Sequence, residues 1–445
     1  MLNRFTADYL ETLSNADFMP APKVSGRLAS FDGLLMEAVG LTLPVGTVCQ
    51  VGGENDAKVE AEVIGFRNGR TIMMNLGGPA ALLPRAPVRP VANSGAGEAE
   101  VGAAMLGRVV DGSGKPIDGL GPIRGAGRWP LGGKLQSPLD RGRVLKPMDV
   151  GVRAINGLLT IGQGQRVGIM AGSGVGKSVL LGMMVRAAQA DVIVIGLIGE
   201  RSREVADFLE TKVAGEARKR AVVVAVPANH SPVLRIRGAL RATAIAEAFR
   251  AEGKKMLLIM DSLTRVAHAG REIGLALGEP ASARGYPPSA IAMLPNLIER
   301  AGVDVHTGGS ITAIYTVLAD GDDGNDPVVD SARSILDGHI VLSRQLAERG
   351  VYPAIDIGPS VSRVMTDIVD GPHAKAARVL RRNLATYEEN RDLVLMGAYR
   401  AGADPAIDTA IACHGAIMEY IRQESGENVS LADAVMELTG VFGDA

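Results

Sequence analysis

The apolar positions of residues 1–22 recur at helical spacing and predict an amphipathic helix that Pro20 and Pro22 end. The apolar stripe consists of Leu2, Phe5, Tyr9, Leu10 and Leu13. Periodicity alone does not distinguish a helix docked on its own domain from one that binds a partner. The hypothesis of a partner-binding helix rests on position, because a short terminal helix has little else to hold it.

The pattern changes to short apolar runs in residues 23–92, which predicts a small β-barrel. Turn dipeptides separate these runs at Asp32-Gly33, Gly52-Gly53 and Asn68-Gly69. An Asn-Gly pair between two apolar runs is a strong hairpin signal, so we expect a strand on each side of this pair.

Residues 93–370 are predicted to form an α/β domain, which begins with a linker-like stretch at 93–98. Continuous apolar runs alternate here with helical stretches, which is typical of a mostly parallel sheet covered by helices on both faces. The predicted strands are residues 166–170, 191–198, 221–226, 255–260 and 310–317.

The pattern is helical in residues 371–445 and predicts a small helical C-terminal domain. Gly402 resembles a helix stop, and Asp404-Pro405 resembles the start of the next helix. Ser430, with Asp433 three residues later, resembles a capping box.

Composition and charge narrow the class of protein. The chain has 445 residues, of which 47% are hydrophobic, so a sizeable core is available and wholesale disorder is excluded. The net charge is −2 and only 3% of the residues are aromatic, which argues against a protein that coats nucleic acid or stacks bases. We therefore expect no nucleic-acid partner.

The rest of the composition indicates a soluble, cytoplasmic protein. Cys49 and Cys413 lie far apart in the sequence, as ordinary thiols of a reducing compartment do, and the six histidines form no zinc motif. Asp8 and Glu11 interrupt the N-terminus, so we expect no signal peptide. The longest apolar runs, near 192–198, are far shorter than the ~20 residues of a membrane span.

The central motif is AGSGVGKS, residues 171–178, which fits the phosphate-loop pattern except that alanine replaces the first glycine. Its glycines allow several backbone N–H groups to face one anion at the start of the following helix. Lys177 would reach the outer phosphates and the Ser178 hydroxyl would bind Mg²⁺. The predicted ATP-binding residues of this loop are Ala171, Gly172, Ser173, Gly174, Val175, Gly176, Lys177, Ser178 and Val179.

Two acidic residues follow apolar strands and should emerge at the carboxyl edge of the sheet. Asp261 would orient Mg²⁺ through a bound water molecule; the alternative is an N-cap for the next helix. Glu200 would orient and polarise the attacking water, with Arg201 and Glu204 close by. The alternative for Glu200 is a solvated turn that opens a helix, and spacing alone leaves both interpretations open.

Longer motifs resemble the catalytic subunits of rotary-type ATPases, and more closely the flagellum-specific ATPases of type III export. The motifs shared with the rotary family are GERSREV (199–205), LLIMDSLTR (257–265), LGRVVDGSGKPIDG (106–119) and YPAIDIGPSVSR (352–363). The closer match rests on GLLMEAVGLTLPVGTVC (33–49), the alanine of the phosphate loop, GYPPSAIAMLPNLIERAG (285–302) and DSARSILDGHIVLSR (330–344). The resemblance implies a RecA-like P-loop core after an N-terminal β-barrel.

The resemblance also implies roles for individual residues. Glu200 matches the catalytic carboxylate of the family, and Arg201 and Arg265 resemble arginines near the phosphates. Arg363 resembles the arginine finger that reaches the nucleotide of the neighbouring subunit; a structural ion pair is the alternative. Tyr352 resembles the residue that stacks on adenine, and core packing is the alternative.

The implied activity is Mg²⁺-dependent ATP hydrolysis by a homohexameric ring that energises export of flagellar proteins. The implied partners are a regulatory export protein at the N-terminal helix, a stalk-like protein at the pore loop 319–330, and export substrates or chaperones at the C-terminal domain. Peripheral contact with an inner-membrane export gate is implied as well. The same loop, residues 319–330, is rich in aspartate (the acidic loop), but it lacks the ligand spacing of a calcium site.

Four other functions remain open from the sequence. A virulence-type III secretion ATPase would share the chemistry, and the catalytic subunit of a rotary ATP synthase would need a partner chain. A hexameric nucleic-acid motor is disfavoured by charge and aromatic content. A nucleotide-binding scaffold without turnover is disfavoured by Glu200.

Overall fold

The computed structural model describes residues 25–52, 58–78, 81–91, 97–318 and 326–443. The chain forms two compact units, residues 1–97 and 98–445. The predicted N-terminal helix, most of the predicted linker and the greater part of the acidic loop lie outside the described residues.

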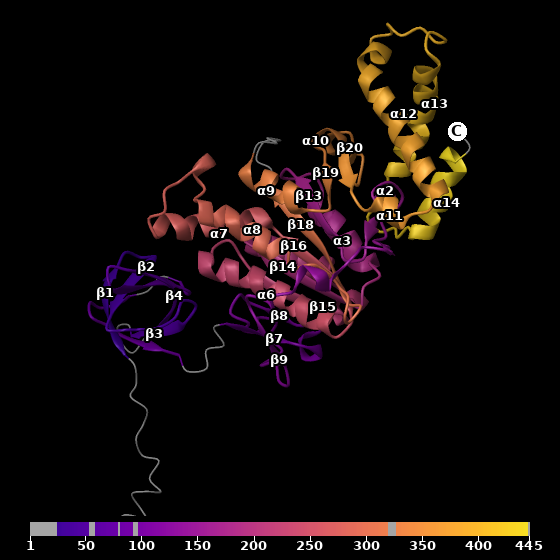
Figure 1. Cartoon of the computed structure of the whole chain (residues 1–445). Helices are drawn as coiled ribbons and strands as arrows, with labels where there is room; N and C mark the ends of the chain where they lie inside the picture. Colours follow the sequence, from indigo (N-terminus) through magenta and orange to yellow (C-terminus); the bar gives the residue numbers. More distant parts are fainter. Residues whose placement is uncertain (1–24, 53–57, 79–80, 92–96, 319–325, 444–445) are drawn as a thin grey trace, which may run out of the picture. The chain divides into compact units, whose positions relative to one another are not determined.

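The first unit contains the predicted β-barrel, which is closed by six strands in the order β1-β2-β5-β4-β3-β6 (Figure 1). Asn68 and Gly69 form the turn between β4 and β5, with φ angles of 51° and 70°. Both angles are left-handed, as a two-residue hairpin turn requires, so this prediction is confirmed. The strands are β1 (Gly26–Phe31), β2 (Leu35–Val39), β3 (Val48–Gly52), β4 (Lys58–Arg67), β5 (Arg70–Asn75) and β6 (Pro87–Pro90).

The second unit is built on a ten-stranded sheet whose longest path runs β20-β19-β13-β18-β16-β14-β15-β8. The pairs along this path are parallel except that β20 runs antiparallel to β19. The five predicted strands are confirmed as β13 (Arg166–Ala171), β14 (Val192–Ile198), β15 (Ala221–Val226), β16 (Lys255–Asp261) and β18 (Ser310–Leu318). Sequence analysis missed β8 (Val109–Val110), β10 (Arg141–Gly142), β17 (Gly302–Asp304), β19 (Gly338–Leu342) and β20 (Ile355–Ser362).

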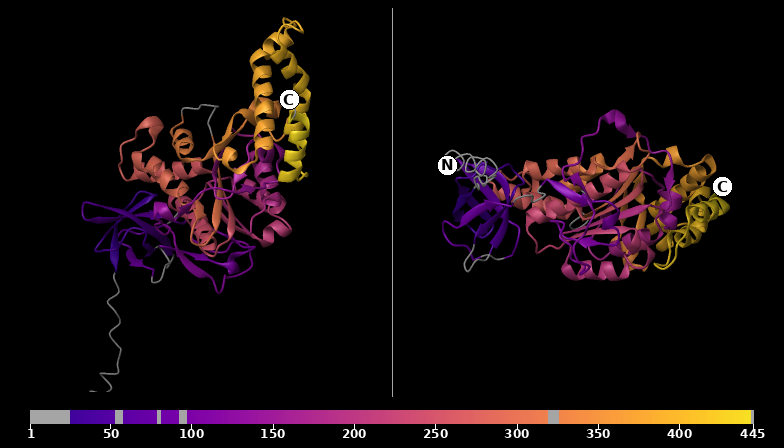
Figure 2. Two further views of the ribbon diagram at one scale, coloured as in Figure 1. Left: turned by 45° about the vertical axis from the view of Figure 1, so that its right-hand side comes forward. Right: turned by 90° about the horizontal axis from the view of Figure 1, so that it is seen from below.

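Helices cover both faces of this sheet (Figure 2), which explains why β14 and β15 have no polar side chain at any position. Ile193, Ile195 and Leu197 share one core with the helices on their side: α2 (Arg153–Leu158), α3 (Lys177–Ala187), α4 (Ser202–Thr211) and α5 (Glu216–Lys219). Gly196 faces Ala242 on the other side, where the helices are α6 (Pro232–Ala251), α7 (Leu263–Ala276), α8 (Pro288–Ile298) and α9 (Pro327–Ile335).

Short elements complete the second unit at its periphery. Two two-stranded sheets pair β7 with β9 and β11 with β12. The remaining short elements are β7 (Glu98–Val101), β9 (Gly127–Pro130), β11 (Pro147–Met148), β12 (Ile161–Gly162), α10 (Arg344–Glu348) and α11 (Met365–Ile368).

The C-terminal part is helical, as predicted, and α12 and α13 run side by side as a hairpin (Figure 1). Asp404 caps α13 and Ser430 caps α14, each by accepting a backbone N–H, so both predicted starts are confirmed. The predicted stop at Gly402 is wrong: the preceding helix ends at Leu395, and the left-handed residue after it is Gly397. The helices are α12 (Gly371–Leu395), α13 (Pro405–Ile421) and α14 (Leu431–Phe442).

Candidate active site

A glycine-rich loop joins the carboxyl end of β13 to the start of α3, where the phosphate-loop motif lies. Gly174 and Gly176 have φ angles of 80° and 92°, a left-handed backbone that other residues rarely adopt. This backbone allows the loop to curl toward the N-terminus of α3. Such a concave arrangement of amides at a helix N-terminus binds anions, phosphate above all.

The side chain of Lys177 meets both predicted carboxylates at the carboxyl edge of the sheet. Its Nζ lies 2.5 Å from Asp261 Oδ1 and 3.4 Å from Glu200 Oε1. Asp261 ends β16, and Glu200 follows the neighbouring strand β14 by two residues. Both acids are buried, at 3% and 9% exposure. The fold thus brings Lys177 together with two carboxylates that follow it in the sequence by 23 and 84 residues.

Burial and charge shift the proton affinities of this cluster. Burial, together with the negative charge of Asp261, raises the pKa of the Glu200 carboxyl, although Lys177 and Arg265 oppose the shift. Burial alone would lower the pKa of the Lys177 ammonium, but Asp261 and Glu200 outweigh it and raise that pKa above its ordinary value. Lys177 therefore stays protonated, while Glu200 is a stronger base than an exposed glutamate.

Thr316, on β18, also belongs to this cluster, and sequence analysis missed it. Its Oγ1 donates a hydrogen bond of 2.6 Å to Asp261 Oδ1, and the side chain is fully buried. The bond fixes the orientation of the carboxylate. The only signal in the sequence is a hydroxyl near the end of an otherwise apolar strand, at a position whose neighbour on β16 cannot be known without the strand order.

The structure contains neither of the alternatives considered for the two acids, an N-cap for Asp261 and a solvated turn for Glu200. Ser262, rather than Asp261, caps α7, because its Oγ accepts a hydrogen bond from Arg265 N. Glu200 is buried instead of forming a solvated turn, and the next helix begins after Arg201.

The two arginines predicted near the phosphates lie in different surroundings. Arg265, in the first turn of α7, packs so closely on the Gly199 backbone that a Cβ there would lie 2.6 Å from its side chain. Its charge also lowers the pKa of Glu200. Arg201 has a side chain that is 84% exposed and pairs with Glu204 at 3.3 Å. The structure therefore brings Arg265 to the cluster and leaves Arg201 at the surface.

The predicted metal-binding residues fit a magnesium ion that is bound mainly by nucleotide and water. Ser178 lies in the first turn of α3, one residue after the lysine that contacts Asp261. Within the described part of the chain, no three acidic, histidine or cysteine side chains converge to hold a metal by themselves. Mg²⁺ commonly takes one or two protein ligands and fills its other positions with phosphates and water.

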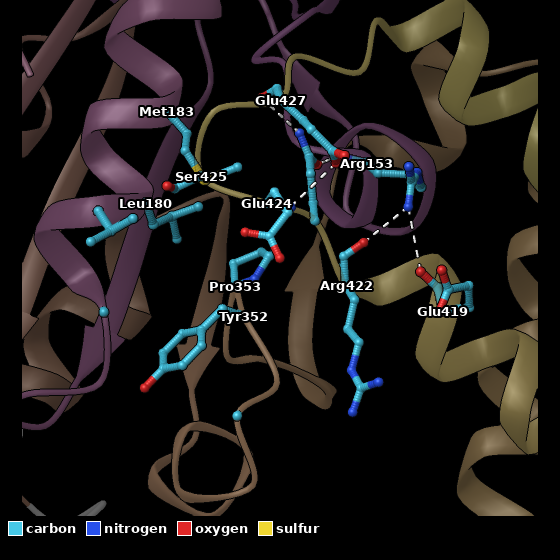
Figure 3. A pocket seen from close by; sticks show the side chains of 14 residues that line it. Arg153, Leu180, Met183, Tyr352, Pro353, Glu419, Arg422, Glu424, Ser425 and Glu427 are labelled. Atoms are coloured by element: carbon cyan, nitrogen blue, oxygen red, sulfur yellow. Dashed lines mark hydrogen bonds between the residues drawn. The ribbon is translucent and has the colours of Figure 1, made fainter.

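A cavity of about 500 Å³ lies beside the phosphate loop (Figure 3). Leu180 and Met183 of α3 form one wall, and Tyr352 and Pro353 lie below them. Tyr352 is 46% exposed, and its ring is so close that a Cβ on Gly176 would contact it at 3.4 Å. Because the Tyr352 side chain is partly exposed in the cavity, it is not a core residue, which was the alternative interpretation.

Another wall of this cavity is the segment 422–427 between α13 and α14, which sequence analysis did not identify. Gln423 N donates a hydrogen bond of 2.9 Å to the Tyr352 carbonyl, so the segment is anchored to the residue predicted to stack on adenine. Nothing in the sequence links the two segments, because they meet only when the helical domain packs on the sheet.

Arg363 lies near the amino ends of the parallel strands, whereas the phosphate loop lies at their carboxyl ends. Ser362, the last residue of β20, pairs with Gly338 at the start of β19, whereas Ala171 pairs with Leu342 at the end of that strand. Arg363 donates to the Arg333 carbonyl at 3.3 Å, and no carboxylate in the described part of the chain forms an ion pair with it. The ion pair left as the alternative is thus absent from the described residues.

A parallel sheet with helices on both faces, an anion-binding loop after one strand, and a lysine and two carboxylates beyond it define a P-loop nucleoside triphosphatase. The family model for the nucleotide-binding domain of the ATP synthase alpha/beta family matches residues 151–362. The model for the C-terminal domain of the T3SS EscN ATPase matches residues 369–440.

Relatives of known name match nearly the whole chain. It is 50% identical over 437 residues to the flagellum-specific ATP synthase of Pseudomonas aeruginosa, covering 97% of this chain and 96% of the relative. It is 49% identical to the flagellum-specific ATP synthase of Salmonella typhimurium, covering 99% of each. It is 44% identical to the type 3 secretion system ATPase of Pseudomonas savastanoi pv. phaseolicola, covering 94% of each.

Solved structures agree with these matches. The assembled ATPase EscN of the enteropathogenic Escherichia coli type III secretion system superposes with a TM-score of 0.87 at 40% identity, covering 94% of this chain and 100% of EscN. EscN in complex with its central stalk EscO gives 0.85 at 39%, with the same coverage. The chain belongs to the family of flagellum-specific and type III secretion ATPases.

Proposed function

We propose that this chain hydrolyses ATP with Mg²⁺ in a homohexameric ring and thereby energises export of flagellar proteins through the flagellar type III apparatus. The observation that carries the proposal is the contact of Lys177 with Glu200 and Asp261 beside the phosphate loop. This arrangement contains the groups that phosphoryl transfer to water requires: anion donors, a cation and a carboxylate base.

Nucleotide binding is assigned to the phosphate loop and the adjacent cavity. The loop amides and the Lys177 ammonium would hold the phosphates, and the base would lie against Tyr352 in the 500 Å³ cavity. Ser178 would bind Mg²⁺ directly and Asp261 would hold it through water. The ion would neutralise charge that develops on the phosphates.

Glu200 is assigned to orient the attacking water. Its carboxylate is buried next to Lys177, so a nucleotide whose phosphates attract the ammonium would release one acceptor face of Glu200 toward the water. The raised pKa of Glu200 suits this role, because a stronger base polarises water better. Arg265 lies close enough to influence that charge.

Arg363 is assigned to the active site of a neighbouring subunit. It follows β20 at the amino ends of the parallel strands. Ser362 pairs with Gly338, four residues before the Leu342 that pairs with Ala171, so Arg363 lies about 16 Å along the strand direction from the loop; this separation supports a role at another subunit's nucleotide. An arginine finger supplied in trans contributes about 10³–10⁵ in rate in GTPases. Hydrolysis would then depend on assembly, and an isolated subunit would waste little ATP.

Flagellar export is favoured over the other functions by two comparisons. The relatives with 49–50% identity are flagellum-specific, whereas the type 3 secretion relatives have 43–44%; further flagellum-specific relatives have 41–44%. The match of the C-terminal segment to a type III secretion domain disfavours the catalytic subunit of a rotary ATP synthase. A virulence-type secretion ATPase stays as the alternative, and loss of motility in a deletion strain would distinguish the two.

The proposed partners follow from the relatives and from exposed surfaces. The complex of EscN with EscO supports a ring with a stalk-like partner for this chain as well. Leu393, Leu395 and Met396 are exposed at the tip of the α12–α13 hairpin and offer an apolar surface to export substrates or chaperones. We assign a regulatory export protein to residues 1–22, where the sequence predicts a helix, and we expect no nucleic-acid partner.

Location at the cytoplasmic side of an inner-membrane export gate is part of the same proposal. Across the described ranges, none of the helices has the length and apolar character needed to cross a membrane.

Mixing two inactive variants tests the shared active site. Arg363→Ala keeps a competent phosphate loop but lacks the finger, and Glu200→Gln supplies the finger but has no base. Rings that contain both chains should recover ATPase activity, because some interfaces combine a competent loop with a finger. The measurement is the ATPase rate across mixing ratios after subunit exchange.

The matched control for this mixture is Lys177→Ala with Glu200→Gln. Both of these chains have defective loops and intact fingers, so no ratio should restore activity. Absence of recovery in the Arg363→Ala mixture at every ratio would contradict the assignment of a finger in trans.

A further inference from the structure

The buried amide of Gln165 lies between the two backbone segments that hold Arg363, at the amino edge of the sheet. Gln165 is fully buried and directly precedes β13. Its Nε2 donates to the Asp337 carbonyl and to Ser362 Oγ, each at 3.1 Å, and its Oε1 accepts from Gly162 N at 2.8 Å. One amide thus joins the chain before β13, the turn before β19 and the end of β20.

Both residues that receive the amide hydrogens hold the backbone of Arg363. The Asp337 carbonyl also accepts the Arg363 N–H at 2.9 Å. Ser362 precedes Arg363 directly, and its hydroxyl donates to the Thr160 carbonyl at 2.8 Å. The direction in which Arg363 leaves the sheet is therefore set by hydrogen bonds that converge on Gln165.

The surroundings leave little room for a different arrangement. A Cβ on Gly338 would lie 2.5 Å from the Val361 carbonyl and 3.2 Å from Gln165 Nε2, so only glycine permits this approach. The Asp337 carboxylate accepts from Arg166 at three nitrogen atoms, each at 3.0 Å. The turn that offers its carbonyl to Gln165 is consequently held from both sides.

We propose that Gln165 is a positioning residue that aims Arg363 into the active site of the neighbouring subunit. The proposal rests on the proposed function, since it needs Arg363 to act in trans. β13 carries the phosphate loop at its carboxyl end and Gln165 at its start, and six residues of strand span about 20 Å. The single strand β13 thus connects a subunit's own phosphate loop with Gln165, which positions the Arg363 that would act in the neighbouring subunit.

The first test is the kinetics of Gln165→Met, which keeps the length of the side chain and removes its polar atoms. A displacement of about 1 Å at a reacting centre can cost about 10²-fold, so we expect kcat to fall about 10- to 100-fold. KM and the dissociation constant for ATP should change less than about twofold, because the phosphate loop is untouched. Gln163→Met is the matched control, since Gln163 Nε2 donates to the Pro147 carbonyl instead.

The second test decides which site is damaged. Gln165→Met mixed with Glu200→Gln should recover activity, because the second chain supplies a correctly held finger. Gln165→Met mixed with Arg363→Ala should not recover, because neither chain has a working finger. Recovery with Arg363→Ala, recovery with neither, or an unchanged kcat would each overturn the proposal.

Two further results keep the test decisive. If Gln165→Met does not fold, Ser362→Ala replaces it; this variant removes one of the two acceptors and should show the same complementation with a smaller loss of kcat. Recovery in the mixture of Arg363→Ala with Glu200→Gln establishes the finger independently. If that mixture recovers and Gln165→Met with Glu200→Gln does not, the positioning role fails while the proposed function stands.

Discussion

At the level of single residues, the charges beside the phosphate loop stabilise one another. The carboxylates of Asp261 and Glu200 are buried, and Lys177 is the cation that lies within hydrogen-bond distance of both. A buried charge without a partner is strongly destabilising, so the three groups constrain each other as well as the nucleotide. Thr316 adds a neutral donor that holds Asp261 without changing the net charge.

Lys177→Ala should lower kcat/KM for ATP by at least about 10²-fold, because the ammonium is the group that would meet the outer phosphates. Equilibrium binding of ATP and the hydrolysis rate at saturation separate the loss of affinity from the loss of turnover. Lys219→Ala is the control, since Lys219 is exposed and pairs with Glu216. Normal hydrolysis by Lys177→Ala would contradict the phosphate-loop assignment.

The pH dependence of kcat/KM should report Glu200. This group must be ionised to orient water, and burial raises its pKa above the ordinary 4.5, so activity should fall as the pH drops through a midpoint above 4.5. Glu204 contributes to the raised pKa, and Glu204→Gln should therefore move the midpoint to lower pH. The substrate ionises identically in both assays, so a shift to higher pH would refute the assignment of Glu200.

At the level of elements, the packing of α2 against the C-terminal segments joins the sheet to the helical domain. Asn156, fully buried in α2, donates to Asp149 Oδ1 at 2.8 Å and to the Val429 carbonyl at 3.0 Å, and it accepts from Val150 N. Gly157 lies so close to α13 that a Cβ would meet the Tyr420 hydroxyl. These contacts flank the segment 422–427, which lines the cavity beside the phosphate loop.

Asn156→Ala should destabilise the protein by about 1–3 kcal/mol, because buried hydrogen-bonding groups lose their partners. Urea unfolding measures the change in the free energy of unfolding. Asn296→Ala is the control: its amide is exposed and donates within its own helix, so the change should stay within about 0.5 kcal/mol. Equal stability of the two variants would argue against the role of Asn156.

Several elements were predictable because their signal is local. The five central strands are continuous apolar runs, and Asn68-Gly69 adopts the left-handed turn that its sequence favours. β19 and β20 were missed because they lie at one side of the sheet, β20 as its edge strand, and interrupt their buried positions with half-buried or exposed ones. Gly402 was wrong as a helix stop because Gly397, five residues earlier, already takes the left-handed conformation.

At the level of the whole molecule, the proposed active site is incomplete in one chain. The phosphate loop lies at the carboxyl ends of the parallel strands and Arg363 at their amino ends, so the proposed finger would have to come from another subunit. A heterologous interface of this kind closes when the rotation between subunits completes a circle. Each subunit would then use its own loop and lend its own finger.

The ATPase rate per subunit should rise with protein concentration in Mg²⁺ and without nucleic acid. Assembly creates the shared site, so dilution to concentrations at which the ring dissociates should lower the rate. An arginine finger contributes about 10³–10⁵-fold in GTPases, so we expect a decrease of several orders of magnitude. Sizing of the same samples relates the rate to the oligomeric state. A constant rate from samples that contain only monomer would contradict a shared site.

The sequence by itself determined the order of the domains, the central strands and the chemistry at their ends. Local patterns suffice for these features, since apolar runs, glycines and the acids that follow strands act at their own positions. Only the tertiary structure decided that Thr316 meets Asp261, that the segment 422–427 lines the cavity beside the phosphate loop, and that Gln165 and Arg363 lie together at the amino ends of the parallel strands. Strand order and helix packing set these contacts, and they depend on interactions between residues distant in sequence.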